Sequence, residues 1–107
     1  MRIESPPLDE LAHLPGVAMR RLLSQTPATA VRVDLAVLHP GASLPRHRTV
    51  HEQVFAVVAG HGRVAGDDDV EHEVGPGSVV TWARGEQHTS WADSPMTVVL
   101  VERTSTD

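Results

Sequence analysis

From about residue 30 onward, turn residues such as Gly, Pro, Asp and Ser divide the chain into short apolar runs. Residues 31–37 alternate between apolar and mostly polar side chains, which is the pattern of a half-buried strand. Residues 54–59 are apolar at every position, so both faces of that strand are expected to be buried. Because many short antiparallel strands hide their edges by closing on themselves, the pattern predicts a single all-β barrel or sandwich. The runs suggest about eight strands, at residues 17–23, 31–37, 54–59, 63–65, 70–74, 78–83, 88–92 and 96–102.

The length of 107 residues suits one domain, because folding at this size buries about two thirds of the surface of the unfolded chain. We expect residues 1–28 to form an N-terminal extension that includes the first strand. Residues 29–104 are expected to form the barrel, and residues 105–107 a frayed tail.

Composition excludes several kinds of chemistry. The formal net charge of −5 argues against binding to nucleic acid, which is itself a polyanion. No apolar run approaches the roughly 20 residues that span a bilayer, and no signal-peptide core is seen, so we expect a cytoplasmic protein without membrane contact. The absence of cysteine excludes disulfides, thiolate nucleophiles and cysteine-based zinc sites. No serine has a nucleophile-elbow context, so the remaining chemistry centres on the histidines and carboxylates.

The segment 41–53 contains the densest group of candidate ligands. His47, His51 and Gln53 stand at odd positions together with Thr49. In one continuous strand these four side chains would point to the same face. If the chain instead turns near Val50, His47 and Gln53 would meet from neighbouring strands. The even position of Glu52, the nearest possible acid or base, places it on the opposite face.

His88 is a further candidate ligand. Imidazole nitrogens combined with an amide oxygen suit a divalent metal such as Fe, Zn, Ni, Mn or Cu. A set of two histidines and one glutamine is neutral, so the bound ion would keep its full charge. Such an ion is held more weakly than one beside a carboxylate, but it is a stronger Lewis acid.

The segments around these residues resemble the two motifs of the cupin family, Gly-x5-His-x-His-x3-Glu-x6-Gly and Gly-x5-Pro-x-Gly-x2-His-x3-Asn. The positions in register are Gly41, His47 and Gly60 for the first motif, and Gly77, Gly85 and His88 for the second. The resemblance is to small single-domain microbial cupins of the cupin-2 type. It implies a jelly-roll barrel, also called a double-stranded β-helix.

The sequence departs from the cupin motifs at positions that matter for a metal. Thr49 replaces the second histidine and Gln53 replaces the glutamate. The resemblance therefore implies a metal held by His47, Gln53 and His88. His51 could compensate for the missing histidine if the turn directs it inward.

The same resemblance implies an enzyme that transforms a small polar or aromatic metabolite by oxygenation, isomerisation or cyclisation. Thr49, Phe55 and Val57 are then expected to line the substrate pocket. The alternative is a non-catalytic ligand-binding or sensor cupin with a degenerate metal site, which Thr49 favours. In that case the histidines could simply form hydrogen bonds inside a polar barrel.

A homodimer is also expected. Val54, Ala56 and Val58 are apolar on the face opposite Gln53, so this strand needs cover on both sides. One barrel interior covers one face, and a second sheet or a partner subunit must cover the other.

Overall fold

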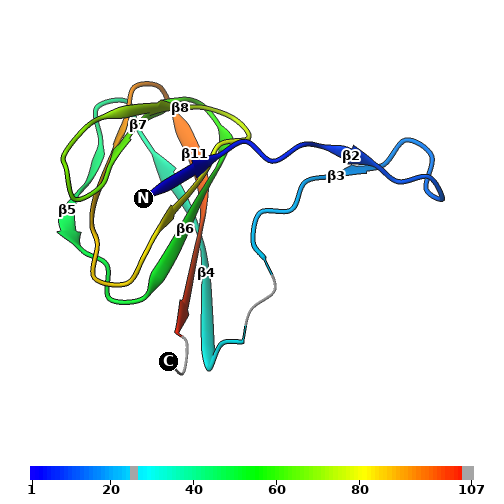
Figure 1. Ribbon diagram of the computed structural model, residues 1–107. Helices are drawn as coiled ribbons and strands as arrows, with labels where there is room; N and C mark the ends of the chain where they lie inside the picture. Colours follow the sequence, from blue (N-terminus) through cyan, green and yellow to red (C-terminus); the bar gives the residue numbers. More distant parts are fainter. Residues whose placement is uncertain (25–26, 105–107) are drawn as a thin grey trace.

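The computed structural model describes residues 1–24 and 27–104, which contain eleven strands and no helix, and hence no helix able to cross a membrane (Figure 1). The expected frayed tail at 105–107 lies outside the described residues. The all-β prediction is confirmed. The strands are β1 (Arg2–Glu4), β2 (Asp9–Glu10), β3 (Ala18–Met19), β4 (Ala30–Leu38), β5 (Ser43–Arg48), β6 (Glu52–Ala59), β7 (Gly62–Ala65), β8 (His72–Val74), β9 (Val79–Trp82), β10 (Gln87–Ala92) and β11 (Met96–Thr104).

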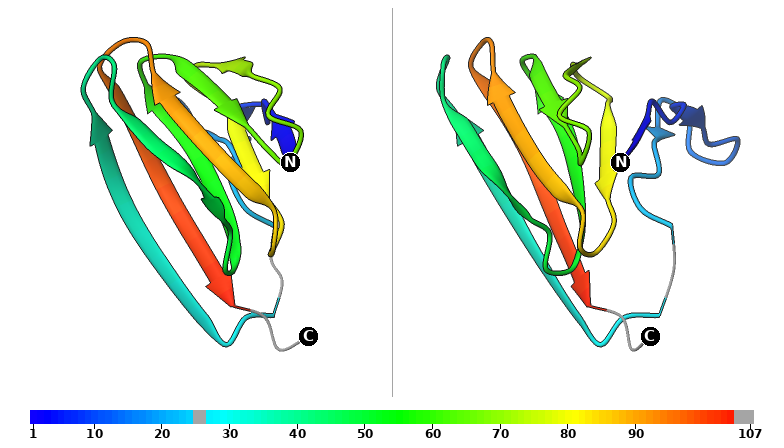
Figure 2. Two further views of the ribbon diagram at one scale, coloured as in Figure 1. Left: turned by 90° about the vertical axis from the view of Figure 1, so that its left-hand side faces the viewer. Right: turned by 60° about the vertical axis from the view of Figure 1, so that its left-hand side comes forward.

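Two antiparallel sheets face each other and form the barrel (Figure 2). The five-stranded sheet has the order β1-β9-β6-β11-β4, and the four-stranded sheet has the order β5-β10-β7-β8. Neighbours in each sheet are mostly distant in sequence, so the chain crosses between the layers repeatedly. The candidate ligands on β5, β6 and β10 therefore come from both layers.

The main core lies between the two sheets. Phe55 and Val57 of β6 point inward together with Val80 and Trp82 of β9 and Val98 of β11, and all five are buried. Fully burying an aliphatic or aromatic side chain of this kind contributes roughly 1.5–3 kcal/mol.

The second face of β6 is covered in part by the chain itself. Val54 and Ala56 are buried in a smaller cluster, and Leu23 of the N-terminal segment packs against it. Val58, further along the same face, is exposed. The N-terminal segment thus supplies some of the cover that the apolar pattern of β6 requires.

The expected first strand is much shorter than residues 17–23. It is reduced to β3, which pairs with β2 in a small hairpin that extends away from the barrel (Figure 1). Arg20 and Arg21 interrupt the apolar alternation, and Met19 and Leu22 remain exposed, so no sheet is available to extend the strand.

Candidate functional site

The chain reverses direction between the two strands that carry the first candidate ligands. β5 ends at Arg48 and β6 begins at Glu52, so residues 49–51 form the turn. His47 therefore lies in the four-stranded sheet and Gln53 in the five-stranded sheet. Of the two arrangements that the sequence left open, the structure has the one with a turn.

Pro45 explains how β5 presents His47. β5 is an edge strand, and its ladder with β10 shifts register between the pairs His88–His47 and Ser90–Leu44, which marks a β-bulge. A proline lacks the backbone N–H that a ladder uses, and it is tolerated at such an edge bulge. The carbonyl of Pro45 accepts a hydrogen bond from Nδ1 of His47 at 2.8 Å, which orients the imidazole ring.

His47 and His88 face each other across neighbouring strands. They are direct partners in the ladder, their ring centroids are 4.0 Å apart, and their Nε2 atoms are 2.9 Å apart. His47 lies at the surface, whereas His88 is 4% exposed. The two histidines of the predicted site are thus in direct contact.

The hydrogen bonds determine where the protons of this pair lie. A carbonyl oxygen can only accept, so Nδ1 of His47 carries a proton and Nε2 of the neutral ring has a free lone pair. Nε2 of His88 then donates the hydrogen that the two rings share. Burial and, to a smaller extent, His47 lower the pKa of His88 from 6.5 to about 4, against an opposite effect of Glu86. His88 is therefore neutral at neutral pH, which is the state in which imidazole binds metals.

The indole ring of Trp82 packs against the imidazole ring of His88. The centroids of the Trp82 and His88 rings are 4.8 Å apart. Phe55 and Trp82 form a T-shaped pair with centroids 5.7 Å apart. The indole Nε1 of Trp82 donates to the carbonyl of Ala65 at 3.2 Å. Because this side chain is fully buried and hydrogen-bonded, it gives His88 a fixed packing partner in the core.

Gln53 brings the third candidate ligand from the other sheet. It is buried, and it is the cross-strand partner of Trp82. Directly opposed residues of antiparallel strands point to the same face, so the Gln53 amide points into the barrel beside Trp82. Trp82 is therefore the cross-strand partner of Gln53 and the packing partner of His88.

The other predicted site residues are placed differently. His51 lies in the turn between β5 and β6 and is half-buried. Thr49 is buried in the same turn, and its hydroxyl donates to the backbone carbonyl of Glu86 at 2.7 Å. Phe55 and Val57 pack in the core between the sheets. Sequence reasoning missed Glu86, whose position two residues before His88 was the available signal.

Residues 34–102, which contain His47, Gln53 and His88, match the family model of the cupin domain. The chain belongs to the cupin family. The resemblance of the sequence motifs is thereby confirmed. No curated protein matches this cupin.

Solved structures share the fold of this cupin at low sequence identity. An RmlC-like cupin family protein with a double-stranded β-helix fold from Methanocaldococcus jannaschii has a TM-score of 0.65 at 16% identity, covering 69% of this chain and 70% of that protein. A DMSP lyase from Ruegeria pomeroyi has a TM-score of 0.64 at 19% identity, covering 72% of this chain and 40% of the lyase. A mutant of salicylate 1,2-dioxygenase from Pseudoaminobacter salicylatoxidans has a TM-score of 0.64 at 17% identity, covering 67% of this chain and 20% of that protein. These likenesses confirm the predicted double-stranded β-helix.

The histidine pair of this cupin fits a divalent metal ion. Metal–nitrogen bonds of about 2.0–2.1 Å at the right angle between neighbouring ligands of an octahedral or square site place two ligand nitrogens roughly 2.9 Å apart. The Nε2 atoms of His47 and His88 have this separation, and the backbone carbonyl on Nδ1 of His47 is a usual support for a ligating imidazole. Within residues 1–24 and 27–104, no three His, Asp or Glu side chains gather as for a metal ion. Further ligands would therefore be the Gln53 amide or molecules from outside the chain.

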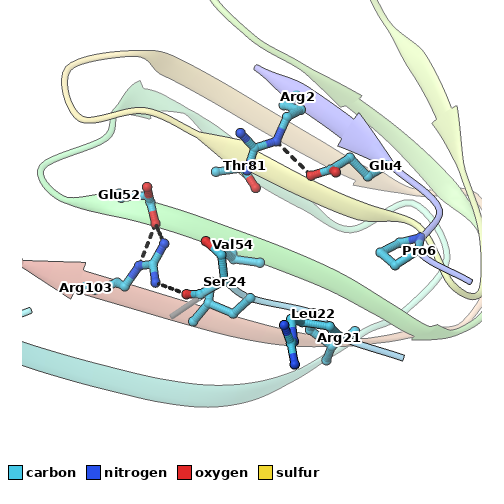
Figure 3. Close-up of a pocket in the computed structure, with 11 residues that line it drawn as sticks. Arg2, Glu4, Pro6, Arg21, Leu22, Ser24, Glu52, Val54, Thr81 and Arg103 are labelled. Atoms are coloured by element: carbon cyan, nitrogen blue, oxygen red, sulfur yellow. Dashed lines mark hydrogen bonds and ion pairs between the residues drawn. The ribbon is translucent and has the colours of Figure 1, made fainter. Parts of the chain in front are cut away.

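A separate charged pocket lies on the outer face of the five-stranded sheet (Figure 3). It has a volume of about 250 Å³ and lies between the N-terminal segment and strands β6, β9 and β11. Arg103 donates to the carboxylate of Glu52 at 2.7 Å and to the carbonyl of Ser24 at 2.7 Å. Glu52 thus faces away from the histidine pair, as its position in the sequence predicts.

Proposed function

We propose that this cupin holds one divalent metal ion between His47 and His88, with Gln53 as the third protein ligand, and that it is an enzyme acting on a small polar or aromatic metabolite. The observation that supports this most directly is the 2.9 Å separation of the two Nε2 atoms. In the metal-free protein one hydrogen occupies the space between them. A metal ion would take the place of that hydrogen.

His88 and His47 would have different roles in such a site. His88 supplies a neutral imidazole fixed on Trp82, and His47 supplies a second imidazole at the surface, where a ligand can reach it. The metal would supply Lewis-acid chemistry and open coordination positions for the substrate. Oxygenation, isomerisation or cyclisation is the reaction class we propose. The dioxygenase and lyase among the structures of similar fold are consistent with such chemistry.

A second candidate is a ligand-binding module without turnover. It is favoured by the neutral ligand set and by the absence, in the described part of the chain, of a group of three His, Asp or Glu residues. In this case the hydrogen bond between His47 and His88 would be the functional state, and a small ligand would bind without a metal.

Trp82 provides a direct test of metal binding. The chain has two tryptophans, so Trp91→Phe leaves Trp82 as the single fluorophore. Because Trp82 packs against His88, one equivalent of Cu²⁺ should quench its fluorescence strongly, and EDTA should restore it. Zn²⁺ should compete with Cu²⁺ for the site. In the matched variant Trp82→Phe, the remaining Trp91 should be quenched less.

Azide separates the two candidate functions. In an enzyme with open coordination positions, azide should change the visible absorption of the Co²⁺-loaded protein. A protein that takes up no Co²⁺, Zn²⁺ or Cu²⁺ in this assay contradicts the proposed metal site and leaves the binding module. A saturated metal that does not respond to azide contradicts the enzyme.

We also propose a homodimer, in which a second copy of the chain covers the outer face of β4. The alternate positions of this strand form an exposed apolar row, in which each side chain is between 58% and 67% exposed. An isologous contact brings a surface against itself, so an uncharged row avoids placing like charges together. The row consists of Val31, Val33, Leu35 and Val37.

Sedimentation of the wild-type protein at micromolar concentration is expected to give the mass of a dimer. Leu35→Glu should give a monomer, because it places like charges in the middle of the contact. Val70→Glu is the matched control, since Val70 is also exposed but lies near the tip of another hairpin. A monomeric wild type, or an L35E protein that remains dimeric, contradicts this interface.

A further inference from the structure

Thr49 stands where the cupin motif has its second histidine, yet it is buried between two exposed neighbours. The flanking side chains of Arg48 and Val50 are exposed, whereas Thr49 is 3% exposed. Its hydroxyl and its backbone N–H both donate to the carbonyl of Glu86, at 2.7 Å and 2.8 Å. Its own carbonyl accepts a hydrogen bond from the N–H of Gly85 at 2.7 Å. We call these three hydrogen bonds the Thr49 clasp.

The Thr49 clasp lies at the end of a very short stretch of pairing between β5 and β10. On one side of His47 the ladder is interrupted at the Pro45 bulge, and on the other side β5 ends at Arg48. Two ladder pairs, His47 with His88 and Arg48 with Gln87, lie between the bulge and the clasp. β5 is an edge strand, so no second neighbour within its sheet holds His47. The clasp, together with the hydrogen bond from the exposed Arg48 side chain to the carbonyl of Gly85 at 3.1 Å, therefore fixes this end of the strand.

The turn that receives the clasp is itself fixed. The carboxylate of Glu86 accepts a hydrogen bond from the N–H of Ala83 at 3.0 Å, which spans the turn. The carboxylate of Asp67 accepts one from the N–H of Gln87 at 2.7 Å. The Glu86 carbonyl thus stands at a defined place, two residues before His88. A contact made to it controls how β5 approaches β10.

We propose that Thr49 is a positioning residue, which sets the separation of the His47 and His88 Nε2 atoms by joining the turn after one histidine to the turn before the other. The expected effect of Thr49 on metal binding rests on the function proposed above. The expected effect of Thr49 on the contact between the two imidazole rings is independent of that function. The cupin motif has a metal-ligating histidine at this position. In this chain the residue at the same position supports the two histidines of the proposed site.

The test is Thr49→Val, which keeps the branched shape of the side chain and removes the hydroxyl donor. We expect the affinity for Co²⁺ to fall about tenfold, in the range found when the support of a ligating histidine is lost. The visible spectrum of bound Co²⁺ should change as well. Thr49→Ser retains the hydroxyl and should restore both. Thr29→Val removes a hydrogen bond of the same type, from Thr29 to the carbonyl of Thr104, and should leave both unchanged.

A second measurement does not depend on the metal. The imidazole N–H shared by His47 and His88 should be visible by ¹⁵N NMR in the metal-free wild type and in T49S, and weakened in T49V. A wild type that binds no Co²⁺ contradicts the proposed function, while the NMR signal still tests the positioning. A T49V protein with wild-type affinity, spectrum and N–H signal overturns the inference.

Thr49→Ala provides the test if T49V does not fold. It removes the hydroxyl donor without adding bulk at this buried position, so the fold should tolerate it. We expect the same fall in Co²⁺ affinity, of about tenfold, and a weakened shared N–H signal. No change in either measurement overturns the inference.

Discussion

Replacing His88 by alanine should lower the affinity for Co²⁺ or Zn²⁺ by more than about a hundredfold, because loss of a direct ligand exceeds the 10–100-fold cost of losing its support. His47→Ala should have a comparable effect, since the pair contributes both nitrogens of the proposed site. Isothermal titration or equilibrium dialysis measures the change. His61→Ala is the control, because His61 is an exposed residue in another turn and should leave the affinity unaltered.

Folding must be checked in the His88 variant, because this residue is buried against Trp82. His88→Leu is the companion variant, since it fills more of the space and has no ligand atom. An H88A or H88L protein that is folded and still fully loaded with metal would sink the assignment of His88 as a ligand.

The second large effect is expected for Gly60→Ala. Gly60 has a φ of 79°, and an added Cβ would stand 1.9 Å from the carbonyl oxygen of Pro95 and 2.8 Å from Cα of Met96. Both are backbone atoms, so they cannot move aside as a flexible side chain would. The positive φ costs about 1–2 kcal/mol for any residue with a Cβ, and the clash adds about 1–3 kcal/mol. The loss is a large part of the 5–15 kcal/mol that stabilise a typical domain.

Gly41→Ala separates the two contributions to this loss. Gly41 is also a motif glycine with a positive φ, of 85°, but nothing lies within 4 Å of its added Cβ. We therefore expect a cost of about 1–2 kcal/mol from the backbone alone. Urea unfolding of both variants measures the difference. Equal losses for G60A and G41A would contradict the close approach of the backbone at Gly60.

The barrel strands were predictable because apolar alternation is a local property of the sequence. The expected strand at 31–37 differs from β4 by one residue at each end, and the expected strand at 88–92 differs from β10 by one. β5 was missed because Pro45 argues against pairing, and its tolerance depends on an edge position that the sequence does not reveal. The cover of Val54 by Leu23 was also missed, since packing between distant segments leaves no periodic signal.

The site was predictable to a similar extent. Motif spacing identified His47 and His88, which the structure brings together. It could not show that the Thr49 hydroxyl is engaged by a backbone carbonyl, because any residue type at Glu86 supplies the same acceptor. Nor could it show Trp82 beneath His88, because these two side chains meet from different sheets.

His47 and His88 belong to one sheet of the barrel and Gln53 to the other, so a shared ion would act as a crosslink between the two layers. An ion bound by the native state and not by the unfolded chain adds stability in proportion to the logarithm of its free concentration, about 2.7 kcal/mol at a hundred times the dissociation constant. The lifetime of the folded protein would then depend on the supply of metal around it. A cell that runs short of that metal would then lose the folded protein itself.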